Sequence, residues 1–163
     1  MRRRRVGALA ASALLAGSLT GCAGGPFVTA GTCVDWVAFD TPADALADAS
    51  SAVVGTVGAQ QGTTDLYGYT VSVWTVHVER WVKGTGGADI RVVSAPETCS
   101  EGSPYPSGDP LADASGPQLI LLHDENGALR TITPWQGIVP ADAHGALPNA
   151  WPPGTMGSPA PVS

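Results

Sequence analysis

The sequence predicts a small all-β domain in which five strands form a closed or half-closed barrel with one short helix; a β-sandwich is the alternative arrangement. Short runs of β-branched and aliphatic residues recur along the chain and are separated by glycine-containing turns. Glycine and proline are abundant, with 21 and 14 residues, whereas charged residues make up only 13% of the chain. This composition is typical of strands joined by turns and long irregular connections.

The helix is predicted just before the first strand. Thr41 suits an N-cap, Pro42 suits the first helical position, and Asp44 stands three residues after the cap. We expect a short helix that ends by about Ser50, with Leu46 as its only large apolar residue.

Five strands are predicted from the hydrophobic pattern. They span residues 51–59, 67–82, 89–95, 118–123 and 129–133. The dipeptide Asn126-Gly127 predicts a hairpin turn, and residues 62–65 and 83–87 predict two further turns. The fourth strand is continuously apolar, which is typical of a strand buried on both faces.

The second predicted strand changes its apolar face part-way along. Two alternating sets of apolar residues follow each other, namely Tyr69, Val71 and Val73, and then Trp74, Val76 and Val78. Such a change of parity predicts a β-bulge or a bend within one long strand.

Two segments, residues 96–117 and residues 148–163, are rich in proline, glycine and serine, and we predict no regular structure for them. The folded domain is therefore expected to span residues 33–147. Residues 22–32 before it are glycine-rich and suit a flexible tether.

Residues 1–21 have the organisation of a signal peptide. Four arginines, Arg2 to Arg5, precede an uncharged run of small and apolar residues at positions 6–19. The run is shorter than the roughly 20 residues that a spanning helix needs, but it suits a signal peptide. The next residues, Leu19-Thr20-Gly21-Cys22, resemble the lipobox of bacterial lipoproteins.

The lipobox resemblance implies that the chain is cut before Cys22 and that this cysteine is acylated. Two or three acyl chains bind a bilayer stably, so the domain is expected on the outer face of the cytoplasmic membrane, outside the cytoplasm. An ordinary cleaved signal with an unrelated cysteine nearby is the alternative.

The chain has three cysteines, which is an odd number for an exported protein. Acylation of Cys22 leaves Cys33 and Cys99, which we expect to form a disulfide in an oxidising compartment; two free buried thiols are the alternative. The sequence lacks Cys-x-x-Cys and His-x-x-x-His spacings, so we predict no metal site and no cofactor.

The chain after the signal peptide is acidic. Loss of Arg2 to Arg5 leaves four basic residues against fourteen acidic ones, so the net charge changes from −6 to −10. This charge argues against a nucleic-acid partner and against electrostatic adhesion to anionic lipids.

The order of several short motifs resembles bacterial secreted domains related to the tissue-inhibitor-of-metalloproteinase (netrin-like) module. The motifs are AVVGTV at 52–57, YTV at 69–71, VERWVKG at 78–84, IRV at 90–92, the later Cys99, and Gln136-Gly137. The resemblance covers roughly residues 50–140 and implies an OB-type barrel, a fold that can bind oligosaccharides or peptides.

In the animal inhibitors the mature chain begins with a cysteine whose amine and carbonyl chelate the zinc of the protease. Acylation of Cys22 would prevent this, and the glycine-rich tether separates Cys22 from the domain. The resemblance therefore supports the fold and argues against that inhibitory mechanism.

No catalytic residues are predicted. His77 with Glu79, and His123 with Asp124, come nearest to an acid–base pair, but no GxSxG motif supplies a nucleophile. We interpret these histidines and His144 as surface residues. A small hydrolase or metal-dependent enzyme is the alternative function.

The tryptophans suggest a binding surface. Trp74 and Trp81 lie in predicted strand sequence and are expected to pack in the core, whereas Trp135 and Trp151 are expected to be exposed, with Trp135 as the candidate binding residue. The leading hypothesis is a non-catalytic, membrane-tethered module that binds an envelope protein or a glycan. Protease inhibition through a loop is a further alternative.

Overall fold

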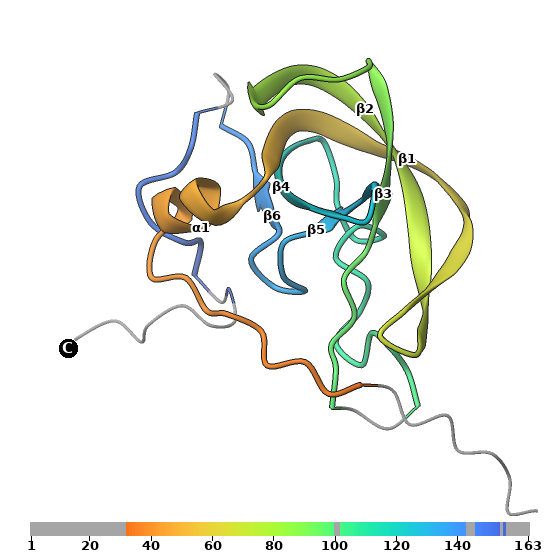
Figure 1. Ribbon diagram of the computed structural model, residues 1–163. Helices are drawn as coiled ribbons and strands as arrows, with labels where there is room; N and C mark the ends of the chain where they lie inside the picture. Colours follow the sequence, from red (N-terminus) through yellow and green to blue (C-terminus); the bar gives the residue numbers. More distant parts are fainter. Residues whose placement is uncertain (1–31, 100–101, 143–145, 154, 156–163) are drawn as a thin grey trace, which may run out of the picture.

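The computed structural model describes residues 32–99, 102–142, 146–153 and 155. They form one short helix and six strands (Figure 1): α1 (Pro42–Asp48), β1 (Ser51–Leu66), β2 (Tyr69–Lys83), β3 (Asp89–Val93), β4 (Pro117–Glu125), β5 (Ala128–Thr131) and β6 (Ile138–Pro140). The predicted all-β class with little helix is confirmed. The signal peptide, Cys22 and His144 lie outside the described residues. Within them, no helix is both long and apolar enough to span a bilayer.

The strands belong to one sheet that closes into a ring of five. β1 pairs with both β2 and β4, β2 pairs with β3, β3 runs parallel to β5, and β5 pairs with β4. This ring agrees with the OB-like form of the prediction. The sixth strand, β6, pairs with β4 and was not predicted, because three residues are too few to show a pattern.

Helix α1 begins as the sequence predicts. The Thr41 hydroxyl accepts a hydrogen bond from the Asp44 backbone N–H, and the Asp44 carboxylate accepts one from the Thr41 N–H, both at 3.2 Å. At the other end, Lys83 Nζ donates to the carbonyls of Leu46 and Ala47 at 3.0 and 2.9 Å. A cation in this position is favourable because the carbonyl end of a helix carries partial negative charge.

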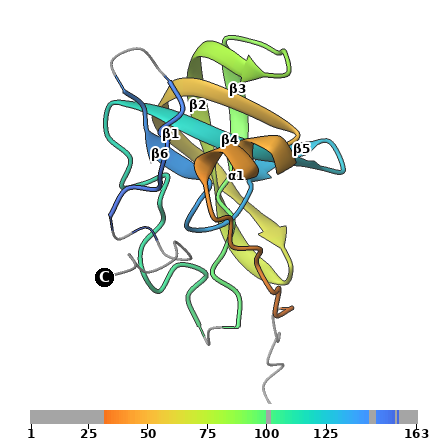
Figure 2. The ribbon, with the colours of Figure 1, turned by 90° about the vertical axis from the view of Figure 1, so that its left-hand side faces the viewer.

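The hydrophobic core has two main parts, one on each face of β1 and β4. Inside the ring lie Val53, Val76, Val92, Leu111, Ile120 and Leu122. On the outer face, which α1 covers (Figure 2), lie Phe39, Ala45, Ala49, Ala52, Val54, Leu119, Leu121, Ile132, Val139 and Trp151. Strand β4 is therefore buried on both faces, as its continuous apolar run predicts.

The first hairpin differs from the prediction. Residues 62–65 do not form a turn, because β1 continues through them to Leu66. The turn is at Tyr67-Gly68, where φ is 57° and 80°, and positive φ at both positions is what a tight two-residue hairpin requires. Gly62, at φ 128°, instead lies at a shift in register between β1 and β2, so the strand bulges there rather than ending.

The predicted change of face in β2 is confirmed. Val71 and Val73 pack with Val93 in a small cluster towards the β1–β2 turn, whereas Val76 and the partly buried Trp74 pack inside the ring of strands. Two of the four register shifts in the β1–β2 pairing flank Gln60, which lies opposite Trp74.

Two segments predicted to lack regular structure are nevertheless packed. The described part of the β3–β4 connection has no helix or strand, but its Leu111 is only 1% exposed inside the ring. In the C-terminal segment, the expectation that Trp151 is exposed is wrong: it is 7% exposed, and its indole N–H donates to the Phe39 carbonyl at 2.7 Å. Burial of the large apolar indole ring of Trp151 against the outer core is more favourable than its exposure to water.

Candidate functional site

A groove of about 510 Å³ lies between the β3–β4 connection and the residues that follow β5. The connection contributes Glu97, Ser107 and Asp113, β4 contributes Gln118, and the segment before β6 contributes Trp135. We call this the acidic groove. Its volume is typical of ligand sites. Described residues of the 96–117 connection, which the sequence predicts to be irregular, thus line one surface with Trp135, the candidate binding residue.

The loop is fastened to the ring through Asp109. Its carboxylate accepts hydrogen bonds from the Trp74 indole N–H at 3.0 Å, from the Ser94 hydroxyl at 2.5 Å and from the Leu111 backbone N–H at 3.0 Å. The Tyr105 hydroxyl adds a bond to the Ser94 carbonyl at 3.0 Å. Because these bonds fix its middle, the loop presents a defined wall to the groove.

Glu97 supplies the more deeply placed carboxylate. It is 9% exposed, and its two oxygens accept bonds from the Ser107 N–H at 3.2 Å and the Ser107 hydroxyl at 3.1 Å. Its own backbone N–H donates to the Pro104 carbonyl at 2.8 Å. The sequence pattern did not mark Glu97 and Asp113 as groove residues; the only signal was that they are acidic residues within a proline-rich connection.

Trp135, which was expected to be exposed, is only partly exposed and lies in the turn before β6. The neighbouring Gln136 is 1% exposed, and its amide makes two bonds of 2.9 Å to the backbone of Phe39. A Cβ on Gly137 would lie 2.7 Å from the Thr133 carbonyl oxygen, so the tight turn requires glycine there. The Trp135 indole N–H is buried and has no hydrogen-bond partner among the described residues.

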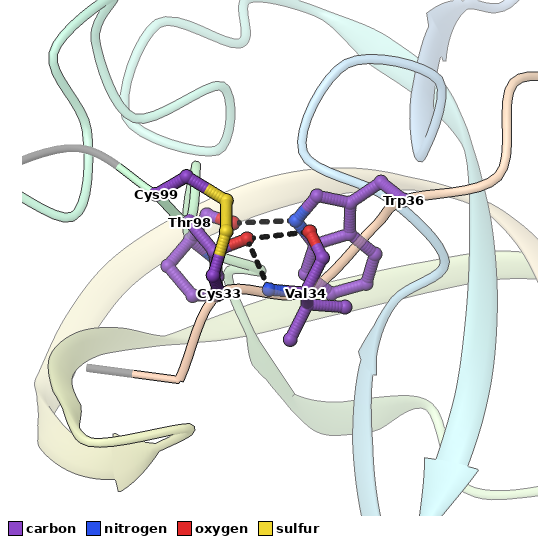
Figure 3. Close-up of a disulfide and its surroundings, with 6 residues drawn as sticks. Cys33, Val34, Trp36, Thr98 and Cys99 are labelled. Atoms are coloured by element: carbon purple, nitrogen blue, oxygen red, sulfur yellow. Dashed lines mark hydrogen bonds between the residues drawn. A yellow bond between two sulfur atoms is a disulfide. The ribbon is translucent and has the colours of Figure 1, made fainter.

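The predicted disulfide between Cys33 and Cys99 is present, with 4.6 Å between the two Cα atoms (Figure 3). Next to it, the Thr98 hydroxyl donates to the Val34 carbonyl at 2.7 Å and accepts from the Val34 N–H at 2.9 Å. The Trp36 indole N–H donates to a carbonyl of the same connection at 3.1 Å. The segment before α1 is therefore tied to the start of the loop that lines the groove.

A second polar cluster holds the β1–β2 turn against β4 and β5. The Tyr67 hydroxyl and Arg130 Nε both donate to Glu125 Oε2 at 2.6 Å, and the Arg130 guanidinium lies 5.3 Å from the centre of the Trp36 ring. Burial works to raise the pKa of Glu125, but the hydrogen bonds from Tyr67 and Arg130 and the charge of Arg130 outweigh it, so this pKa is lowered. Burial and the bond to Glu125 raise the pKa of Tyr67. The cluster is internally satisfied, which indicates a structural role.

The histidines form two separate pairs. His77 Nδ1 lies 2.6 Å from Asp89 Oδ1 with both side chains exposed, and His123 Nε2 lies 3.7 Å from Asp48 Oδ2. Glu79, predicted to share a side with His77, accepts a hydrogen bond from a threonine of β1 at 3.3 Å. Within the described ranges, no three histidine, cysteine or acidic side chains are placed to hold a metal ion.

A second groove, also of about 510 Å³, runs along β3. Thr64, Val73, Val93, Ala128 and Leu129 line it, and we call it the hairpin groove. It lies between the end of β1 and the β4–β5 turn. The sequence pattern does not reveal this groove, because its residues come from four strands.

Comparison of the chain with protein-family models, with curated proteins and with solved structures finds no match. The features that bear on function are therefore the N-terminal motif and the chemistry of the two grooves.

Proposed function

We propose that this chain is a lipid-anchored, non-catalytic binding module on the outer face of the cytoplasmic membrane, and that the acidic groove is its recognition surface. The observation that carries the proposal is that the 96–117 loop and Trp135 line the same groove. An aromatic side chain within a groove of ligand size is the usual anchor of a binding site, because it buries a large rigid surface at little entropic cost.

The lipobox supports the anchor. Residues 22–32 separate Cys22 from Cys33, and a fully extended chain of this length reaches at most ~40 Å. The domain would therefore meet partners close to the membrane: a protein or glycan of the cell envelope, and not nucleic acid.

The anchor is tested by the intact mass of the protein extracted from membranes, measured with an alkylating agent before and after reduction. We expect a chain that begins at Cys22, carries added acyl mass and is alkylated at Cys33 and Cys99 only after reduction. An unmodified Cys22 would exclude the lipid anchor.

The recognition surface is tested by a photo-crosslinking amino acid placed in the membrane-bound protein. Ser115 is an exposed position in the groove, and Gln61 is an exposed position on β1 that lines neither groove. We expect one discrete crosslinked partner from position 115, none from position 61, and loss of the product when Trp135 is also replaced by alanine. Equal products from both positions would contradict the assignment.

The exposed His77–Asp89 pair is the observation that favours the alternative, a small hydrolase or metal-dependent enzyme. Hydrolase substrates and bound metal are measured on the same preparation, with inhibition of envelope proteases assayed alongside. Turnover that disappears in His77→Ala would replace the binding proposal with an enzymatic one.

A further inference from the structure

The acidic groove combines flat apolar surfaces with charges of one sign. Its apolar walls come from Pro110, Pro134, Trp135, Ile138 and Pro140. Its charged side chains are Glu97 and Asp113, and no lysine, arginine or histidine lines it in the described part of the chain. A ligand that complements the groove therefore presents a positive charge beside an apolar, extended surface.

The environment of Trp135 also indicates a ligand-binding role. Its indole N–H is buried without a partner among the described residues, and an unsatisfied buried donor costs about 1–3 kcal/mol. Phenylalanine would fill much of the same space without this cost. Because buried polar groups in native proteins are almost always paired, such an exception suggests a residue kept for what its ring does in the groove.

The carboxylates of Glu97 and Asp113 differ in how they could bind a cation. Glu97 is held in place by Ser107 and is nearly buried, so its carboxylate is pre-oriented. Asp113 is exposed on the same loop and can adjust to an incoming group. A guanidinium or ammonium group between them would form charge-assisted hydrogen bonds, and it could also stack on the Trp135 ring.

We propose that the acidic groove binds an extended, proline-containing peptide segment that carries an arginine or lysine, presented by a protein partner. Proline-rich segments are already extended in solution, so they lose little entropy when they dock on aromatic-lined grooves. A neutral glycan could donate hydroxyl hydrogen bonds to the two carboxylates, but it brings no positive charge and therefore complements the groove less fully than a cationic peptide does. This inference rests on the proposed function and specifies its ligand.

The experiment is an NMR titration of the whole chain in detergent, with its disulfide intact. The probes are the peptide Ala-Pro-Pro-Arg-Pro-Ala, its matched form with glutamate in place of arginine, a form with alanine in place of every proline, and a neutral chito-oligosaccharide. We expect saturable shifts of the Trp135 indole signal and of residues 97–118 with the arginine peptide, and binding about tenfold weaker for the glutamate and alanine peptides.

Asp113→Asn should weaken the arginine peptide by a similar factor and should not weaken the glutamate peptide, because the substitution removes a like-charge repulsion. Asp65→Asn, on an exposed part of β1 outside the acidic groove, should change neither. Equal binding of the arginine and glutamate peptides, binding of the oligosaccharide alone, or no binding of any probe would overturn the inference. The inference would also be overturned if deletion of residues 156–163, with no peptide present, shifted the NMR signals of the groove residues. Such a shift would mean that the groove holds the chain's own C-terminal segment. A crosslinked partner at position 115 without peptide binding would leave the proposed function standing and reject only this ligand class.

Discussion

The disulfide between Cys33 and Cys99 joins the segment that precedes α1 to the loop that lines the acidic groove. Glu97, two positions before Cys99, is itself a groove residue. Thr98 reinforces the connection with two hydrogen bonds to Val34. This one covalent bond therefore constrains both the segment that precedes α1 and one wall of the candidate site.

Replacement of Cys33 and Cys99 by serine should destabilise the domain by about 4 kcal/mol, because the bridge spans 66 residues and its loss restores chain entropy to the unfolded state. The measurement is the free energy of unfolding in urea. Cys22→Ser, the matched control, should leave this value unchanged. An equal unfolding midpoint with and without reductant would show that the bridge contributes nothing.

Trp135→Phe should raise the free energy of unfolding by about 1 kcal/mol, because it removes the unsatisfied indole N–H and keeps an aromatic ring. Trp135→Ala should lower it, since the half-buried ring packs on the groove wall. Thermal unfolding of the three proteins checks the order. Destabilisation by phenylalanine would contradict this prediction.

Trp151→Ala should destabilise the domain by about 3–5 kcal/mol, because the ring is 7% exposed in the outer core and bonds to the Phe39 carbonyl. Val37→Ala is the control, since this side chain is 62% exposed and should have little effect. Similar urea midpoints for the two variants would place Trp151 outside the core.

Glu125→Gln should reduce the sensitivity of the fold to acid. The pKa of Glu125 is lower in the folded chain than its ordinary value, so its contribution is present at neutral pH and is lost as the pH falls through the folded-state pKa. Urea unfolding between pH 7 and about pH 3 should show a smaller decline for the variant than for the wild type. Tyr67→Phe should have the same effect in part, because it removes one hydrogen bond to the carboxylate. Parallel curves for all three proteins would contradict the assigned cause.

Local signals in the sequence predicted much of the fold. The capping residues Thr41 and Asp44 form the expected reciprocal bonds. Asn126 and Gly127 have φ of 56° and 86°, as their dipeptide predicts. In each case neighbouring residues determine the outcome, so no knowledge of distant contacts is needed.

Features that depend on distant contacts could not be predicted. Tyr67 takes a positive φ that its residue type does not favour, and the hydrogen bond from its hydroxyl to Glu125 stabilises this conformation. The proline-rich sequence around Trp151 predicts exposure, but contact with Phe39, which is distant in the sequence, buries its side chain.

The candidate site shows the same division. Trp135 could be singled out by its residue type, but its neighbour Glu97 could not, because only the folded loop brings the two to one groove. The fastening of that loop through Asp109 depends on partners in two other parts of the chain, Ser94 and Trp74.

Hydrogen–deuterium exchange of the detergent-solubilised protein, with and without envelope extract, tests most directly whether the acidic groove is the recognition surface. We predict slower exchange at residues 102–118 and 134–140 when the extract is present, no change at residues 60–66, and no protection in Trp135→Ala. Protection that appears instead around the hairpin groove, at residues 64–66 and 127–129, or protection that persists in Trp135→Ala, would contradict the assignment.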